Sequence, residues 1–299
     1  MKRYLSIAAN AFLPGTRSLA IAICCLLSSC ERDITVNLPQ AEVEIVVEGY
    51  IVSGQKPTVH VTRSAPYFSP IDSASLISYL VRDAIVTVSD GSVTDTLDET
   101  FDLSLSNPFV YVARNLVGEN GKNYFLTVKA DGKTLTAITQ IPYAVPLDSV
   151  WFKIDGNKDS LGYAWAHLTD PDTLGNGYRW FAKRLGKDDD FIPPNGSVFD
   201  DKFINGKSFD FGYNRGEVPN SDAIDDINEE SGYFKRGDTI AVKFCTIDRG
   251  HFIFWRSVET QASNNGNPFG SPAPIEGNIQ GGLGIWGGYG VSYDTIYAQ

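Results

Sequence analysis

The sequence predicts an all-β fold: two β-sandwich domains of immunoglobulin-like size in series, with one short helix near the C-terminal end. Along much of the chain apolar residues alternate with polar ones, which is typical of strands with one buried face. These strands recur at short spacing with no helical stretch between them, as they do in β-sandwiches. Pro142 and Pro146 then interrupt the pattern, because closely spaced prolines end strand pairing and stiffen a link.

The N-terminal domain is expected to span residues 41–145. Asp131-Gly132 lies between two alternating runs and predicts a tight hairpin, since both residues tolerate positive φ. The proline-interrupted insertion from Ser64 to Ser78 is either a loop or a contact surface that carries Tyr67 and Phe68. The strands of this domain are expected around Val43–Val52, Val59–Val61, Ala84–Val88, Tyr124–Val128 and Leu135–Thr139.

The C-terminal domain, expected over residues 146–299, is β-rich and contains the predicted helix. The segment His251–Ala262 places Phe252 and Trp255 at helical spacing, and Asn264-Asn265-Gly266 ends it. The acidic segment Gly186–Gly232 contains too many aromatic residues for plain disorder, so we expect one or two irregular strands within long loops. The other strands are expected around Val150–Ile154, Tyr163–His167, Tyr178–Lys183, Thr239–Ile247 and Ile285–Tyr297.

The first 29 residues have the pattern of a lipoprotein signal peptide. Lys2 and Arg3 provide a basic start, and the apolar stretch Ser18–Leu27 is shorter than the roughly 20 residues of an ordinary membrane helix. Leu27-Ser28-Ser29-Cys30 then has the form of a bacterial lipobox, in which the cysteine thiol is acylated before cleavage. We therefore predict a mature chain that begins at a lipidated Cys30 and continues through a tether over residues 30–40.

The predicted location is the outer membrane, with the lipid on Cys30 as the anchor. Glu31 and Asp33 follow Cys30 closely. In this the chain resembles lipoproteins of the Bacteroidota that travel to the cell surface, which commonly carry acidic residues just after the lipidated cysteine. Three residues with two acids also occur by chance. The cell surface is thus the first expectation, and the periplasmic face of the outer membrane is the alternative.

Composition indicates an acidic exported protein. The predicted signal contains three basic side chains and no acid, so the mature chain keeps 22 of the 25 basic side chains against 36 acidic ones, near −14. This charge repels nucleic acid and anionic lipid head groups. Cys24 and Cys25 leave with the signal, so Cys245 is the one thiol left free. It lies in an alternating strand pattern, which favours a buried structural cysteine.

No motif in the sequence indicates a catalytic, cofactor or metal site. Gly282–Gly287 matches G-x-G-x-x-G, but a dinucleotide site needs a helix after it, and here more glycine and a strand follow. His60, His167 and His251 stand alone, whereas metal sites usually pair histidines or cysteines at short spacing. A G-x-S-x-G nucleophile elbow is absent from the sequence. We therefore expect no catalytic residue, no cofactor and no metal.

The acidic loops leave two alternatives open. Loop carboxylates such as Asp189 and Asp201 could serve a surface hydrolase, since a glycosidase uses two carboxyl groups. Calcium capture is the other, by Asp188–Asp190 or by the group Asp222, Asp225 and Asp226. Runs of acids in polar loops are more often a solvated surface, and that is the interpretation we favour.

Several segments of the sequence carry a family resemblance. They are Asn267-Pro268-Phe269 with Pro272, Asn278–Tyr289, Val46–Ile51, Ala84-Ile85-Val86 and Ile141-Pro142. The first two resemble the closing signature of a lipoprotein family of the Bacteroidota, domain of unknown function 4249. Members of that family are found beside TonB-dependent outer-membrane receptors, so the resemblance implies a role with an uptake complex and assigns no catalytic residue.

The function expected from these observations is non-catalytic. The chain would act as an accessory or ligand-capture partner of a TonB-dependent uptake receptor, with Tyr67, Phe68, Trp286 and Tyr289 as a ligand or partner surface. For Trp286 and Tyr289 the favoured alternative is that both pack in the core of the second domain. The other functional classes are the surface hydrolase and an adhesion or structural surface lipoprotein.

Overall fold

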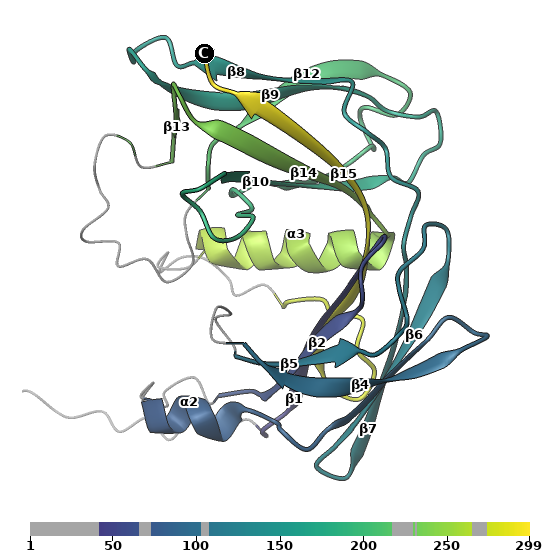
Figure 1. Cartoon of the computed structure of the whole chain (residues 1–299). Helices are drawn as coiled ribbons and strands as arrows, with labels where there is room; N and C mark the ends of the chain where they lie inside the picture. The colour runs from purple at the N-terminus through teal and green to yellow at the C-terminus, as the bar shows by residue number, and fades with distance from the viewer. Residues whose placement is uncertain (1–41, 66–72, 103–107, 217–229, 231, 265–273) are drawn as a thin grey trace, which may run out of the picture. The chain divides into compact units, whose positions relative to one another are not determined.

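The part of the chain that the structure describes is built around two β-sheets. The structure is a computed structural model, and it describes residues 42–65, 73–102, 108–216, 230, 232–264 and 274–299. The larger sheet has eleven strands in the order β11-β10-β14-β15-β1-β2-β5-β4-β3-β6-β7. The smaller sheet has the order β12-β9-β13, with β8 paired to β9 (Figure 1). The all-β class with sandwich-like sheets is confirmed.

The bounds of the elements agree with most of the predicted strands. The first half contains β1 Ile45–Val52, β2 Thr58–Arg63, α2 Ser73–Tyr79, β3 Ile85–Ser89, β4 Thr94–Phe101, β5 Phe109–Ala113, β6 Asn123–Ala130 and β7 Lys133–Gln140. The second half contains β8 Ser149–Ile154, β9 Leu161–Thr169, β10 Gly177–Arg184, β11 Val198–Asp200, β12 Ser208–Tyr213, β13 Phe234–Lys235, β14 Thr239–Ile247, α3 Arg249–Asn264 and β15 Leu283–Tyr297. No helix among the described residues is long and apolar enough to cross a membrane.

The predicted hairpin and the predicted C-terminal helix are both present. Strands β6 and β7 pair around Asp131 and Gly132, whose φ angles of 49° and 72° lie in the left-handed region that a tight turn requires. Helix α3 covers the expected segment and extends two residues beyond it at each end. The acidic segment contains β11 and β12, so the expectation of short strands within long loops is confirmed for its described part.

The insertion after β2 differs from the prediction, because it contains helix α2. Its residues Ser73–Tyr79 follow the last proline of the insertion and contain neither proline nor glycine, so no residue in that stretch opposes helix formation. Tyr67 and Phe68, the residues predicted for a contact surface, lie outside the described residues.

Strand β9 is present where predicted, but its buried side is made of small residues. Ala164, Ala166 and Leu168 are fully buried, whereas Tyr163 and Trp165 on the opposite face are only half-buried. The reason lies in the pairing of β9 with β12, whose aromatic side chains share the buried face, since residues opposite each other on neighbouring strands point the same way. These pairs are Phe209 with Leu168, Phe211 with Ala166 and Tyr213 with Ala164.

The glycine-rich strand β15 joins the two halves of the chain. Its later part pairs with β14 in antiparallel fashion, and its earlier part, from Leu283 to Tyr289, pairs in parallel with β1 (Figure 1). One hydrogen-bonded sheet therefore continues from the first half into the second. The division into domains near residue 145 stays a prediction.

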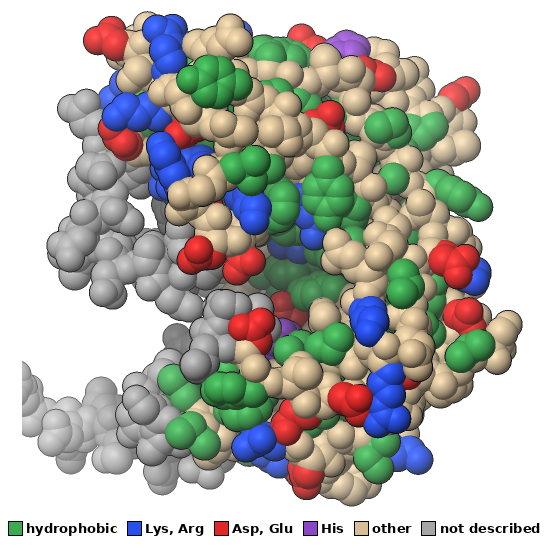
Figure 2. All heavy atoms as spheres, in the orientation of Figure 1, with side chains coloured by type: hydrophobic (Ala, Val, Ile, Leu, Met, Phe, Trp, Pro, Cys, Tyr) green, Lys and Arg blue, Asp and Glu red, His purple; other side chains and the backbone are tan. Residues whose placement is uncertain are grey.

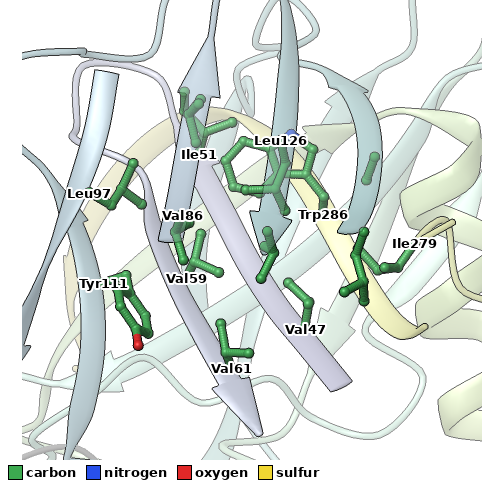
Figure 3. Packing of buried hydrophobic residues seen from close by; sticks show 14 of the residues in the cluster. Val47, Ile51, Val59, Val61, Val86, Leu97, Tyr111, Leu126, Ile279 and Trp286 are labelled. Carbon is green, nitrogen blue, oxygen red and sulfur yellow. The ribbon is translucent and has the colours of Figure 1, made fainter. Parts of the chain in front are cut away.

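Each half has its own hydrophobic core. The first is built mainly from residues such as Val47, Ile51 and Leu126, and it includes Ile279 and Trp286 from the C-terminal part of the chain (Figure 3). The second centres on the buried aromatic side chains Tyr178, Trp180, Phe234 and Phe244.

A third, smaller cluster lies where α3 meets β10, β14 and β15. It contains Cys245, Phe252 and Tyr289, with Tyr50 and Trp255 packed against it. Cys245 is a free and fully buried thiol, as the sequence predicted, and burial raises the pKa of this thiol to about 12. Such a thiol stays protonated and is unsuited to nucleophilic chemistry.

Candidate functional site

A cavity of about 330 Å³ is lined by residues from β1, β2, β10, β14, β15 and α3. Tyr50, Phe181, Trp255 and Tyr289 supply aromatic surface, and Arg179 supplies a cation. Figure 2 shows a hollow on one face of the molecule, with hydrophobic and basic side chains inside it. The remaining lining residues are Glu48, Val52, Thr58 and Lys243. Ligand sites are typically concave and mostly apolar, with a few polar groups that orient the ligand.

A second hollow, of about 340 Å³, lies elsewhere in the C-terminal half. It is lined by Val150, Trp151, Phe152, Ile296, Tyr297 and Gln299. None of these side chains is ionisable except the phenol of Tyr297. The cavity with Arg179 has the richer chemistry, so we treat it as the candidate site.

Arg179 is buried in the candidate site, with a relative exposure of 5 %. Aromatic rings lie against its guanidinium. Its guanidinium carbon lies 3.4 Å from the centroid of the Trp255 ring and 4.6 Å from that of Phe181. Its Nη1 donates a hydrogen bond of 2.6 Å to the hydroxyl of Tyr289, and its Nε has no hydrogen-bond partner. Stacking on aromatic rings favours a guanidinium electrostatically and also fixes its plane.

Lys243 brings a second cation to the same cavity. It is opposite Phe181 in the β10–β14 register, so the two side chains lie on one face of the sheet. Its Nζ is 5.1 Å from the centroid of the Phe181 ring and 5.3 Å from that of Tyr289. Burial lowers the pKa of Lys243, and the positive charge of Arg179 acts in the same direction.

Within the described part of the chain, neither cation has a carboxylate within 4.0 Å. Glu48 also lines the cavity, and its carboxylate accepts a hydrogen bond of 2.8 Å from the hydroxyl of Tyr50. Glu259 of α3 is bonded to Ser197, and burial raises the pKa of its carboxyl, which favours the neutral form. The buried Arg179 and the half-buried Lys243 thus form no direct ion pair, although Glu48 lines the same cavity and Glu259 interacts electrostatically with Arg179.

His251 packs against two of the aromatic residues that line the cavity, Tyr50 and Tyr289. It is fully buried, and the centroid of its ring lies 4.5 Å from that of Tyr289 and 6.0 Å from that of Tyr50. Gly287 makes room for it, because a Cβ at that position would lie 2.4 Å from the imidazole. Burial lowers the pKa of His251 well below its usual value, so the ring stays neutral and acts as a packing group.

The structure separates the two glycine-run aromatic residues that the sequence analysis grouped together. Tyr289 lines the cavity, whereas Trp286 is fully buried in the first core and offers no surface for a ligand or a partner. Its indole Nε1 donates a hydrogen bond of 3.0 Å to the carbonyl of Tyr124. Trp286 is therefore a core residue, as the favoured interpretation expected, but it lies in the first core and not in that of the second half. Cys30 lies outside the described residues.

Of the loop acids considered for catalysis or calcium, Asp188 and Asp201 are engaged in the fold, whereas Asp189 and Asp190 are exposed. Asp188 pairs with Arg184 at 2.7 Å and lies 3.6 Å from Arg215. Asp201 is buried and accepts hydrogen bonds of 2.8 Å from the backbone amides of Gly175 and Asn176. No group of three or more His, Cys, Asp or Glu side chains that could hold a metal is found among the described residues. The second acid group, Asp222, Asp225 and Asp226, lies outside them.

The two cations of the cavity were missed by the sequence analysis. A signal existed, because each interrupts a strand that is otherwise apolar: Arg179 in Tyr178–Phe181 and Lys243 in Ala241–Phe244. A basic residue at such a position must either pair with an acid or line a cavity. The sequence does not show which of the two applies.

Comparison with protein families supplies one match that covers most of the chain. A family model described as domain of unknown function (DUF4249) matches residues 31–295. The chain belongs to this family. The match includes every residue that lines the cavity, and the resemblance seen in the sequence is thereby confirmed at the level of the family. A comparison with curated proteins found no match.

Two of the solved structures similar to this member of the family contain fibronectin type III domains. A two-domain segment of chicken tenascin is 11 % identical, covers 69 % of this chain and 91 % of its own length, and gives a TM-score of 0.20. The first three such domains of chicken CNTN1 are 16 % identical, cover 74 % of this chain and 65 % of their own length, and give a TM-score of 0.23. Values this low carry no argument about function.

Proposed function

We propose that the protein is a non-catalytic, lipid-anchored binding protein of the outer membrane that serves a TonB-dependent uptake receptor as an accessory or ligand-capture partner. The observation that carries the proposal is the aromatic cavity with Arg179 and Lys243, two cations without an acid partner at hydrogen-bond distance. Such a cavity suits recognition of a ligand. Of the two acids named for the hydrolase alternative, Asp189 and Asp201, the second is buried and bound to backbone amides, which favours binding over hydrolysis.

Affinity purification tests the partner. A tag placed after the exposed Gln299 is compatible with the fold, and we expect a large β-barrel receptor to co-purify from native membranes in mild detergent. An unrelated lipoprotein with the same tag, expressed in the same cells, is the control for adventitious capture. Recovery of the lipoprotein alone, together with unchanged growth of a deletion strain on every nutrient tested, would contradict the proposal.

The anchor is tested separately by replacing Cys30. We expect Cys30→Ala to leave an uncleaved precursor without palmitate label, because the lipobox is the membrane signal that the sequence contains. Cys245→Ala is the matched control: its thiol is buried in the fold, and this variant should label like the wild type. Label that survives Cys30→Ala, or is absent from the wild type, would end this interpretation.

Exposure at the cell surface is measured by adding protease to intact cells. The cell-surface proposal predicts degradation of the anchored protein while a periplasmic marker stays intact. Full protection of the chain would place it on the periplasmic face.

A further inference from the structure

We propose that the cavity binds a small organic carboxylate, with the carboxylate between Arg179 and Lys243 and a flat apolar body against the aromatic walls. This inference rests on the proposed function as a capture protein and names the chemical class of what is captured.

The charged end of the ligand follows from the two cations. The guanidinium of Arg179 is fixed in one plane by Trp255 and Phe181, and one of its nitrogens is already used by Tyr289. A planar fork with its orientation set in advance is suited to a planar carboxylate. Lys243 adds a point charge from the neighbouring strand β14. An oxyanion there would supply the direct ion pair that neither cation makes among the described residues.

The charge expected of the ligand follows from the presence of Glu48 in the cavity. Glu48 lines the same cavity as the two basic residues, so one acidic side chain offsets one of the two basic ones. A ligand with one negative charge would match the basic group that remains. A phosphate monoester carries more negative charge than a carboxylate near neutral pH and would be repelled by Glu48. The balance therefore favours a carboxylate over a phosphate.

The size and the lining of the cavity indicate what the uncharged part of the ligand is. A cavity of about 330 Å³ lies at the lower end of the usual range for small-molecule sites. The rings of Tyr50, Phe181 and Tyr289 contribute to its wall, and Val52 adds aliphatic surface. A flat apolar group packs well against such rings.

The test uses the full mature lipoprotein in mild detergent and equilibrium dialysis with three probes of one shape. These probes are 2-naphthoate, 2-naphthyl phosphate and the neutral 2-naphthamide. We expect 2-naphthoate to bind. The affinity of 2-naphthamide should be lower by a factor of at least about ten, because charge-assisted hydrogen bonds are about twice as strong as neutral ones. 2-naphthyl phosphate should lie between them.

Variants identify the residues. Lys243→Met keeps the aliphatic stem and removes the charge, so it should weaken 2-naphthoate binding about tenfold. Lys183→Met is the matched control, since Lys183 is also a half-buried strand lysine 5.1 Å from an aromatic centroid, that of Phe191, but does not line the cavity. Glu48→Gln should strengthen binding of 2-naphthyl phosphate more than that of 2-naphthoate. Circular dichroism and thermal unfolding confirm that each variant is folded.

Several outcomes would overturn the inference. They are equal affinity for 2-naphthoate and 2-naphthamide, tighter binding of 2-naphthyl phosphate, no binding of any probe, or equal weakening by Lys183→Met and Lys243→Met. If the receptor still co-purifies, such a result removes the ligand class and leaves the proposed function intact. If 2-naphthoate binds as expected and no receptor co-purifies, the partner is rejected and the site is kept.

Discussion

Gly284→Ala is expected to destabilise the fold by at least about 2 kcal/mol, because two independent costs fall on this position. Its φ of 111° is one that residues with a side chain rarely adopt. A Cβ there would also lie 1.9 Å from the carbonyl oxygen of Val47, its partner in the parallel pairing of β15 with β1. Neither strand can retreat easily, since both have a second neighbour in the sheet.

The measurement is urea unfolding of the purified protein, followed by circular dichroism. Gly156→Ala is the matched control, because Gly156 is exposed, has no positive φ and would place its Cβ in open space. We expect the control to stay within about 0.5 kcal/mol of the wild type. Equal stability of the two variants would show that β15 and β1 do not approach each other as closely as the structure has them.

Trp286→Ala is expected to lower the free energy of unfolding by about 3–5 kcal/mol, the usual range for removal of a buried large aromatic side chain. The indole is fully buried in the first core (Figure 3) and donates to the carbonyl of Tyr124, which would be left without this partner. It also lies directly over Gly49, where a Cβ would be 2.8 Å from the ring. The absence of a side chain at Gly49 on β1 therefore leaves room for the indole of Trp286 on β15.

Two further variants make this result specific. Trp286→Phe keeps an aromatic ring in the core and should cost less than the alanine variant. Trp151→Ala removes a half-buried tryptophan that stacks on Trp165 and should also cost less, since solvent already reaches that side chain. Unfolding followed by circular dichroism applies to all three. A loss for Trp286→Ala no larger than that for Trp151→Ala would contradict the placement of Trp286 in the core.

Most strands could be predicted because alternation of apolar and polar residues is a local property. Strand β14 matches its predicted bounds Thr239–Ile247, and the hairpin at Asp131-Gly132 needed only two adjacent residues that accept positive φ. Strand β4 was missed because Thr94–Phe101 is mostly polar and exposed. Helix α2 was missed because a run of seven residues is too short for a helical period to stand out.

The candidate site could be predicted only in part. Tyr289 was found because it follows a glycine run that carries a family resemblance, and Trp286 was grouped with it although the strand places the two side chains in different clusters. Arg179 and Lys243 carried a signal in the sequence, but their meaning depended on what lies opposite them. Tyr50 and Trp255 had no signal that separated them from ordinary core aromatics.

By itself, the sequence determined the β class, the positions of most strands and the buried state of Cys245. The prediction of a lipid on Cys30 also depends on the sequence alone. All of these depend on residues close together in the chain. Only the tertiary structure decided that β1 lies beside β15, and that Tyr50, Arg179, Lys243 and Tyr289 therefore meet around one cavity. The physical reason is that strand periodicity sets which face a side chain occupies, whereas pairing between distant strands depends on packing of the whole sheet.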